Sequence, residues 1–319
     1  LGLSGMGYLY GAQVYWVMVG QMIGIGASWW LMSRRLKKLG DESDSITVPD
    51  VLVAKFADKW HLLRGAAVLI IVIMVTTYVT AQMVATGKAF SEFLGMNYET
   101  GVVVGSVIII AYTFVGGYKA VSYTDVVQGV LMLLGLIAVP TAAIIASGGL
   151  DGVTQSLRQQ DPALLNMFAI IDRPVWIGIA SFLAVGLPFL GVPQLLIRYM
   201  SARDDVEIRK ARIMSMIVLF LFAFGAVTAG VAVRALYPGL DDPERIFPVI
   251  SSNLFPPVIA GMLLVVVLSA IMSTVDSLLL LASSSVVRDT YQKIMGSTAS
   301  DARLSSYGKV VTIVIGVIA

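Results

Sequence analysis

Long runs of apolar residues, separated by short polar stretches, extend along the whole chain. The runs reach about 20 residues, the length that an α-helix needs to cross the hydrocarbon core of a bilayer. They predict seven complete spans, near residues 12–33, 66–90, 101–121, 125–147, 174–198, 211–236 and 257–287. An eighth apolar run begins near residue 308. The pattern predicts an all-α polytopic membrane protein, with residues 1–319 forming one transmembrane domain.

The composition agrees with this class. Of the 319 residues, 57% are hydrophobic and only 13% are charged, whereas soluble domains carry about 25% charged residues. A net charge of +2 argues against a nucleic-acid partner, and the absence of cysteine excludes a disulfide or thiolate metal site. The chain starts with Leu1 and stops inside the apolar run "VVTIVIGVIA". We therefore expect a piece of a longer protein, cut at both ends.

Basic residues predict the orientation of the spans. Seventeen of the 22 Lys and Arg residues lie in the segments 33–65, 116–124, 198–213 and 286–309. Cytoplasmic loops carry an excess of Lys and Arg, so these segments are predicted to be cytoplasmic. The first residues and the loops 148–173 and 237–256 are then external. The stretch "DPERIFPVISSNLF" in the second external loop predicts a short helix.

The span at 257–287 carries oxygen-bearing residues in "SAIMSTVDSLLLLASS". Helical spacing places Ser273 and Ser277 on one face, with Asp276 on its flank. Oxygen ligands suit a hard cation such as sodium, and Asp276 could instead carry a proton. The hydroxyls could also simply permit close helix packing. A carboxylate inside a membrane costs about 2.5–3.5 kcal/mol and usually faces a pathway, so a functional role is favoured for Asp276.

Two further segments have alternative interpretations. Asp125, in "VSYTDVVQGV", either caps the helix that follows or forms an ion exit route with Gln128. The span at 174–198 contains glycine and proline at mid-membrane in "AVGLPFLGVPQ", which predicts a broken or kinked helix. A broken helix exposes backbone groups that are tolerated where they line a cavity. Gly20 and Gly24 form a GxxxG motif that indicates helix packing.

Recognised catalytic motifs are missing from the sequence. It contains no His/Glu cluster, P-loop or Ser-His-Asp set. The chain is therefore predicted not to be an enzyme.

Several long motifs resemble a known family. "YTFVGGYKAVSYTDVVQGVLM", followed by "SAIMSTVDSLLLLASSSVVRDTY", is similar to the sodium:solute symporter family, and most similar to its proline and pantothenate permease branch. "SITVPDVL", "LGMNYETG" and "GVPQLLIRYM" match in register. The resemblance implies a leucine-transporter-type fold of two inverted five-helix repeats. The fold would be incomplete here, with core helices two to eight and part of nine.

The resemblance also implies an activity. It suggests secondary active symport of a small organic solute, an amino acid such as proline or a carboxylate such as pantothenate, into the cell. Na+ would be the coupling ion, with no organic cofactor. The expected partners are the solute, sodium and the lipid bilayer, without nucleic acid or an obligate protein partner. The expected location is the bacterial inner (plasma) membrane.

Site residues follow from the matched positions of the family. The shared sodium site uses the carbonyl of Ala270 and the hydroxyls of Ser273 and Thr274, with further carbonyls from the first core helix. A second cation or proton site matches Asp125, Asp276 and Ser277. The Asp at 276 departs from the small hydroxyl that is usual in the family, so this second site could bind either a cation or a proton.

The substrate positions carry over less closely. Tyr78 matches an aromatic residue on the third core helix, and Pro193 matches a proline that follows the broken sixth. Val185 and Phe189 stand where the proline permeases have Trp and Tyr. This exchange disfavours proline and permits a monocarboxylate, pantothenate or another amino acid. Phe189 is also a candidate gate side chain.

Two other functions remain open at the level of the sequence. The chain could be the transporter-like membrane sensor of a signalling protein, in which case a kinase module would follow the last span. It could instead be an ion channel, which would show a continuous polar pore and no saturable solute uptake.

Overall fold

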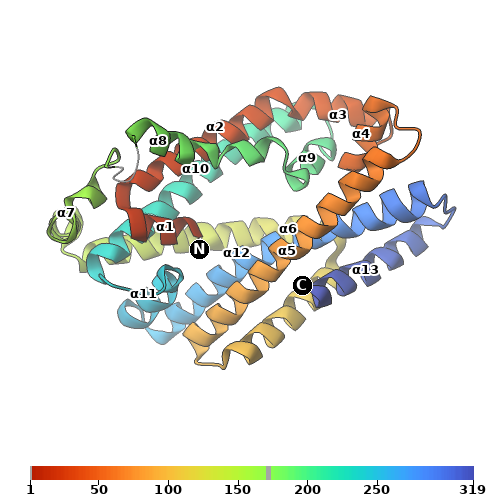
Figure 1. Cartoon of the computed structure of the whole chain (residues 1–319). Coiled ribbons are helices and arrows are strands. Elements are labelled where there is room, and N and C mark those ends of the chain that lie inside the picture. Colours follow the sequence, from red (N-terminus) through yellow and green to blue (C-terminus); the bar gives the residue numbers. More distant parts are fainter. Residues whose placement is uncertain (1, 170–173) are drawn as a thin grey trace. The chain divides into compact units, whose positions relative to one another are not determined.

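The computed structural model describes residues 2–169 and 174–319, and these residues form helices connected by short loops (Figure 1). The α-helices are α1 Gly2–Tyr10, α2 Tyr15–Leu31, α3 Ser33–Glu42, α4 Val48–Phe56, α5 Leu62–Leu94, α6 Tyr98–Ala146, α7 Gly149–Gln160, α8 Val175–Ala184, α9 Pro193–Met200, α10 Asp205–Leu236, α11 Ile246–Leu254, α12 Pro257–Ser284 and α13 Asp301–Ile318. Shorter helices are η1 Gly11–Val14, η2 Pro162–Leu165, η3 Leu187–Leu190, η4 Pro243–Arg245 and the π-helix η5 Ser285–Ile294.

Within the described ranges, five helical segments are long and apolar enough to cross a membrane. They are Leu62–Leu94, Tyr98–Val115, Lys119–Ala146, Asp205–Leu236 and Pro257–Ile294, and the broken pair Val175–Leu190 and Pro193–Met200 would add a sixth. The span predicted at 12–33 forms α2, which has only 17 residues. The predicted short helix forms as η4 and α11. Residues 170–173 of the expected loop 148–173, with Arg173, lie outside the described residues.

The break inside α6 lies within the segment 116–124 that is predicted to face the cytoplasm, but it is shorter than a loop of that length. Gly117 has φ 63° and ψ 177°, a conformation that glycine adopts readily, and it separates Tyr98–Val115 from Lys119–Ala146. The polar stretch from Ser122 to Asp125 therefore continues the second helix instead of forming a loop. Asp125 lies in the second turn of this segment, so the interpretation of Asp125 as a helix cap is wrong.

The predicted break in the span at 174–198 is present. The chain forms α8, then the 3-10 helix η3, and then α9 with Pro193 as its first residue. Proline cannot donate a backbone hydrogen bond, so it is tolerated in the first turn of a helix, where the N–H has no intrahelical partner. The sequence "GLPFLGVP" thus interrupts regular α-helix in the middle of an apolar segment.

The chain divides into two compact units. Unit 1 contains residues 2–29, 129–169, 174–190 and 209–269. In it, the buried side chains of Val14, Val17 and Val227 pack together, and a second cluster joins α7, η2 and α10 through Val153, Leu157, Leu164 and Ala235. Tyr8 is fully buried, and its hydroxyl donates to the carbonyl of Tyr237 at 2.8 Å.

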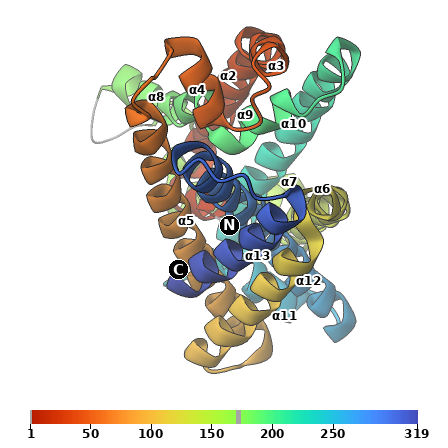
Figure 2. The ribbon, with the colours of Figure 1, turned by 90° about the vertical axis from the view of Figure 1, so that its right-hand side faces the viewer.

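Unit 2 contains residues 30–128, 191–208 and 270–319. Here α5 packs against α4, η5 and α13, and α3 packs against α9. Figure 2 shows α13, in blue, beside the orange α5. The buried residues of α5 recur at helical spacing on one face, at Val68, Ile71, Val75, Val79 and Met83. Large apolar side chains on its other side are exposed, which fits a lipid-facing helix.

A buried network of charged groups joins three elements of unit 2. Arg64, at the start of α5, donates through Nη1 to Asp50 Oδ1 of α4 and to Asp289 Oδ1 of η5, both at 2.6 Å. Arg288 Nε donates to Asp50 Oδ2 at 3.3 Å, and Thr47 Oγ1 donates to Asp289 Oδ1 at 3.0 Å. The network thus pairs the guanidinium groups of Arg64 and Arg288 with the carboxylates of Asp50 and Asp289. The network fixes the start of α4 and the start of α5 against η5.

Glycines allow α2 to approach the broken segment within unit 1. An added Cβ at Gly24 would lie 1.9 Å from the carbonyl oxygen of Gly186, and one at Gly186 would lie 1.8 Å from the carbonyl oxygen of Gly20. The GxxxG motif of Gly20 and Gly24 is therefore used for close backbone packing, as predicted.

Replacing Gly24 with alanine is expected to lower the free energy of unfolding by about 1–3 kcal/mol, because the new methyl group forces two backbones apart. Gly65 on α5 is the matched control, since a Cβ there meets no atom within 4 Å. Gly65→Ala should leave the stability unchanged or raise it by up to about 1 kcal/mol. Thermal unfolding of the purified protein measures both, and equal effects of the two substitutions would contradict the packing described.

Candidate ion-binding site

Three oxygen atoms converge on one turn of α12. Ser273 Oγ donates to the carbonyl oxygen of Ala270 at 3.3 Å, and Thr274 Oγ1 donates to the same oxygen at 3.0 Å. Residues three and four apart lie on one face of an α-helix, so the sequence spacing is sufficient to bring these groups together. All three residues are half-buried. Each hydroxyl keeps two acceptor lone pairs, and rotation of its proton turns it into a cation ligand.

Asp276 lies on a different side of α12 and is fully buried. Thr113 Oγ1, on the first segment of α6, is in hydrogen-bonding contact with Asp276 Oδ1 and is also 2.9 Å from the carbonyl oxygen of Ile109. A threonine hydroxyl has one proton to donate. If the carboxyl group of Asp276 is protonated, it donates to Thr113 Oγ1, and the Thr113 hydroxyl donates to the carbonyl oxygen of Ile109. Both contacts of Thr113 Oγ1 are then hydrogen bonds. Of the two predicted roles, the proton-carrying role fits this geometry better.

Replacing Asp276 with asparagine is expected to change the free energy of unfolding by less than about 1 kcal/mol, because a neutral amide replaces a neutral acid and can donate to Thr113. Asp276→Leu is expected to cost about 1–3 kcal/mol, since the threonine hydroxyl loses a buried partner. Denaturation of both variants, together with the sodium concentration for half-saturation, measures these effects. A tenfold loss of sodium affinity in Asp276→Asn would identify Asp276 as a cation ligand and contradict the protonated state.

Asp125 and Ser277 meet at a third side chain. Arg198 Nη2, in the last turn of α9, donates to Asp125 Oδ2 at 2.6 Å and to Ser277 Oγ at 3.0 Å. The side chain of Asp125 is 12% exposed, whereas that of Arg198 is 50% exposed. Asp125 and Ser277 therefore contact the same guanidinium group, which sequence reasoning had not singled out, and their role as a second site stays a prediction.

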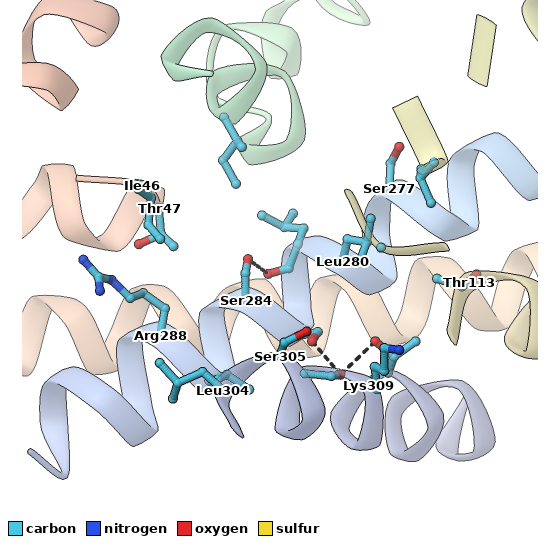
Figure 3. Close-up of a pocket in the computed structure, with 18 of the residues that line it drawn as sticks. Ile46, Thr47, Thr113, Ser277, Leu280, Ser284, Arg288, Leu304, Ser305 and Lys309 are labelled. Carbon is cyan, nitrogen blue, oxygen red and sulfur yellow. Dashed lines mark hydrogen bonds between the residues drawn. The ribbon is translucent and has the colours of Figure 1, made fainter. Parts of the chain in front are cut away.

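A cavity of about 590 Å³ lies in unit 2 and borders several of these groups. Figure 3 shows Ser277, Leu280, Ser284 and Arg288 lining it from α12 and η5, and Leu304, Ser305 and Lys309 from α13. Thr113 and Arg198 also line it. Hydroxyl and basic side chains predominate among its polar groups. Much of its lining comes from the segments that the distribution of Lys and Arg predicts to be cytoplasmic, so the cavity is suited to an opening on that side.

The four predicted substrate residues are divided between the two units. Tyr78, on α5, is about half exposed, and Pro193 begins α9, both in unit 2. Val185 follows α8 and Phe189 lies in η3, both in unit 1. Their roles stay predictions.

Arg198 and Thr113 are the polar residues at this site that sequence reasoning missed. Arg198 was present in the matched motif "GVPQLLIRYM", but it was counted only as a cytoplasmic charge. Thr113 carried a weak signal, as a hydroxyl in a span near a carboxylate that needed a partner. Neither pairing follows from spacing, because 73 residues separate Asp125 from Arg198 and 163 separate Thr113 from Asp276.

Comparison with known proteins decides the family. The sequence pattern of the sodium:solute symporter family matches residues 1–319. The chain belongs to this family. It is 36% identical over 324 residues to the high-affinity proline transporter PutP of Bacillus subtilis (strain 168). The alignment covers all of this chain and 68% of that protein. It is 34% identical over 327 residues to the sodium/proline symporter of Staphylococcus aureus (strain USA300), of which it spans 63%.

A solved structure shows the fold of this family member. The substrate-bound outward-open state of a Na+-coupled sialic acid symporter, described as revealing a novel Na+ site, superposes with a TM-score of 0.81. The match covers all of this chain and 68% of the other, at 19% identity. An identity this low carries the fold alone. The expected fold class, an all-α membrane protein of the leucine-transporter type, spanning part of the length of its relatives, is confirmed, as is the resemblance to the proline permease branch.

Proposed function

We propose that this chain is the transmembrane core of a sodium-coupled symporter that carries a small organic solute into the cell. The convergence of the Ala270 carbonyl with the hydroxyls of Ser273 and Thr274 on α12 is the observation that carries the proposal. It provides three uncharged oxygen ligands on one turn of a helix long and apolar enough to cross a membrane, and this donor set suits a partly dehydrated alkali-metal ion. Family membership and the sodium/proline symporters among its relatives support the same activity.

Sodium supplies the driving force in this proposal. An ion that moves through the membrane potential releases about 2.3 kcal/mol per charge for each 100 mV. Sodium at Ala270, Ser273 and Thr274 stabilises the outward-open arrangement and completes the solute site. Closure follows solute binding, with Phe189 as the gate. Sodium then leaves to the cytoplasm past Asp125, which lies beside the hydroxyl-lined cavity of unit 2.

The solute would be an amino acid such as proline or a carboxylate such as pantothenate. Two curated relatives are named for proline, which supports this class. The resemblance to the family implies solute-binding roles for Tyr78, Val185, Phe189 and Pro193. The apolar Val185 and Phe189 favour a solute that needs few hydrogen bonds from these positions.

The proposal also includes the membrane, the partners and the domain organisation of the protein. Both units belong to one transporter domain in the bacterial plasma membrane, with sodium and the solute as partners. The activity is transport without catalysis and without an organic cofactor. Asp125 and Ser277 form a second polar site around Arg198, and Asp276 carries a proton beside Thr113.

Binding measurements on the full-length protein test the solute class. Proline, pantothenate and acetate are titrated calorimetrically, each in sodium chloride and in potassium chloride at equal ionic strength. We expect at least one solute to bind with higher affinity in sodium, because sodium completes the site. Equal affinities in both salts for every solute would remove the coupling between the ion and the solute.

A further inference from the structure

Arg198 places a positive charge where the resemblance to the family implies a second cation or proton site. Its Nη2 lies 2.6 Å from Asp125 Oδ2 and 3.0 Å from Ser277 Oγ. The first contact is a short, charge-assisted hydrogen bond between a guanidinium group and a carboxylate. Two of the three predicted ligand residues are thus held by one guanidinium group.

The third predicted ligand does not compete for this place. Asp276 is fully buried and contacts Thr113 of α6. With Asp276 engaged there, the oxygens facing Arg198 are one carboxylate and one hydroxyl. This set carries a single negative charge, and a single guanidinium charge neutralises it. A sodium ion carries the same charge, so the ion and Arg198 cannot both be needed at the same oxygens.

We propose that Arg198 is a tethered cation that takes the place of a second sodium ion between Asp125 and Ser277, so that the protein binds one sodium per cycle. The inference rests on the proposed sodium-coupled function and deepens it by assigning the number of ions. Arginine is suited to this role because it stays charged at any physiological pH and its planar group reaches two acceptors at once.

The position of Arg198 also allows the charge to move. Half of its side chain is exposed, and it lines the same cavity of about 590 Å³ as Ser277. Asp125 Oδ1 is buried and has no hydrogen-bond partner, so only one of its oxygens is held by the arginine. When the guanidinium group swings into the cavity, Asp125 is uncovered. A sodium ion that leaves the Ala270 site then meets a carboxylate on its way to the cytoplasm.

The number of sodium ions bound by the full-length protein tests the proposal. Saturation binding of ²²Na+ to the purified protein should give one ion per chain. In Arg198→Gln the tethered charge is gone, and we expect two ions per chain. Arg198→Met, which keeps an apolar stem, serves as a second removal variant if the glutamine variant does not fold. Arg198→Lys keeps the charge and should bind one ion.

Two controls separate the site from general effects of charge. Arg203→Gln removes an arginine whose side chain is 85% exposed and whose Nε is 3.9 Å from Glu207 Oε1. This variant should still bind one sodium ion per chain. Adding Asp125→Asn to Arg198→Gln should return the number from two to one. A wild-type value of two, or a value of one in the folded removal variants, would overturn the role of Arg198 and leave the coupling to sodium intact. A wild-type value of zero would overturn the proposed function together with this inference.

Discussion

Replacing Arg64 with methionine is expected to lower the free energy of unfolding by about 3–5 kcal/mol, the loss typical of breaking a buried ion pair by removing one partner. The guanidinium group bonds to both Asp50 and Asp289, and its side chain is only 5% exposed. Without it, two buried carboxylates face one another with Arg288 as the remaining cation. The start of α5 would separate from α4 and η5. Thermal or denaturant unfolding of the full-length protein in detergent measures the loss.

Arg34 provides the matched control for this substitution. It pairs with Asp205 at 3.7 Å, and the two side chains are 50% and 66% exposed. Exposed ion pairs contribute about 0–1 kcal/mol, so Arg34→Met should have a small effect. If the two methionine variants unfold alike, the network around Arg64 does not hold these helices together.

Removing the hydroxyls of the α12 site should have the largest effect on function. The double substitution Ser273→Ala and Thr274→Val leaves the Ala270 carbonyl as the only one of the three predicted oxygen ligands on this turn. We expect the sodium concentration for half-maximal solute uptake to rise by about 10- to 100-fold or more, since even disturbing the partners of metal ligands has effects of this size. The sodium dependence of initial uptake rates in proteoliposomes measures the change.

Thr141→Val is the matched control for the loss of a helical hydroxyl. Thr141 is exposed on α6 and donates to the carbonyl of Ile137 at 2.6 Å, the same local bond that Thr274 makes. Its removal should leave the sodium dependence unchanged. An unchanged sodium dependence in the α12 double variant would place the coupling ion elsewhere.

Local pattern was enough to predict most of the membrane-spanning helices. Apolar runs located the spans because a bilayer requires continuous helices of a fixed minimum length. The set of Ala270, Ser273 and Thr274 came from the resemblance to the family, and their i, i+3, i+4 spacing places them on one face of α12. The break at Gly117 lies in the predicted loop 116–124, but the polar stretch before Asp125 is helical, because one glycine is enough to interrupt the helix.

Contacts between distant segments could not be predicted from these patterns. Arg64 and Asp289 are 225 residues apart, and nothing in either neighbourhood indicates the other. Arg198 looked like one more cytoplasmic charge until the fold placed it on Asp125. In a sequence, charged residues near the ends of spans indicate only the orientation of the helices. Their ion pairs depend on how the helices pack, which the sequence pattern does not give.

Sodium-driven accumulation of a solute is the direct consequence of the proposed coupling. The full-length protein is reconstituted in proteoliposomes, and radiolabelled proline, pantothenate and acetate are supplied in parallel under an inward sodium gradient or an equal potassium gradient. We expect at least one solute to accumulate above its external concentration with sodium and only to equilibrate with potassium. The same accumulation in both salts, for every solute that enters, would contradict the proposed coupling.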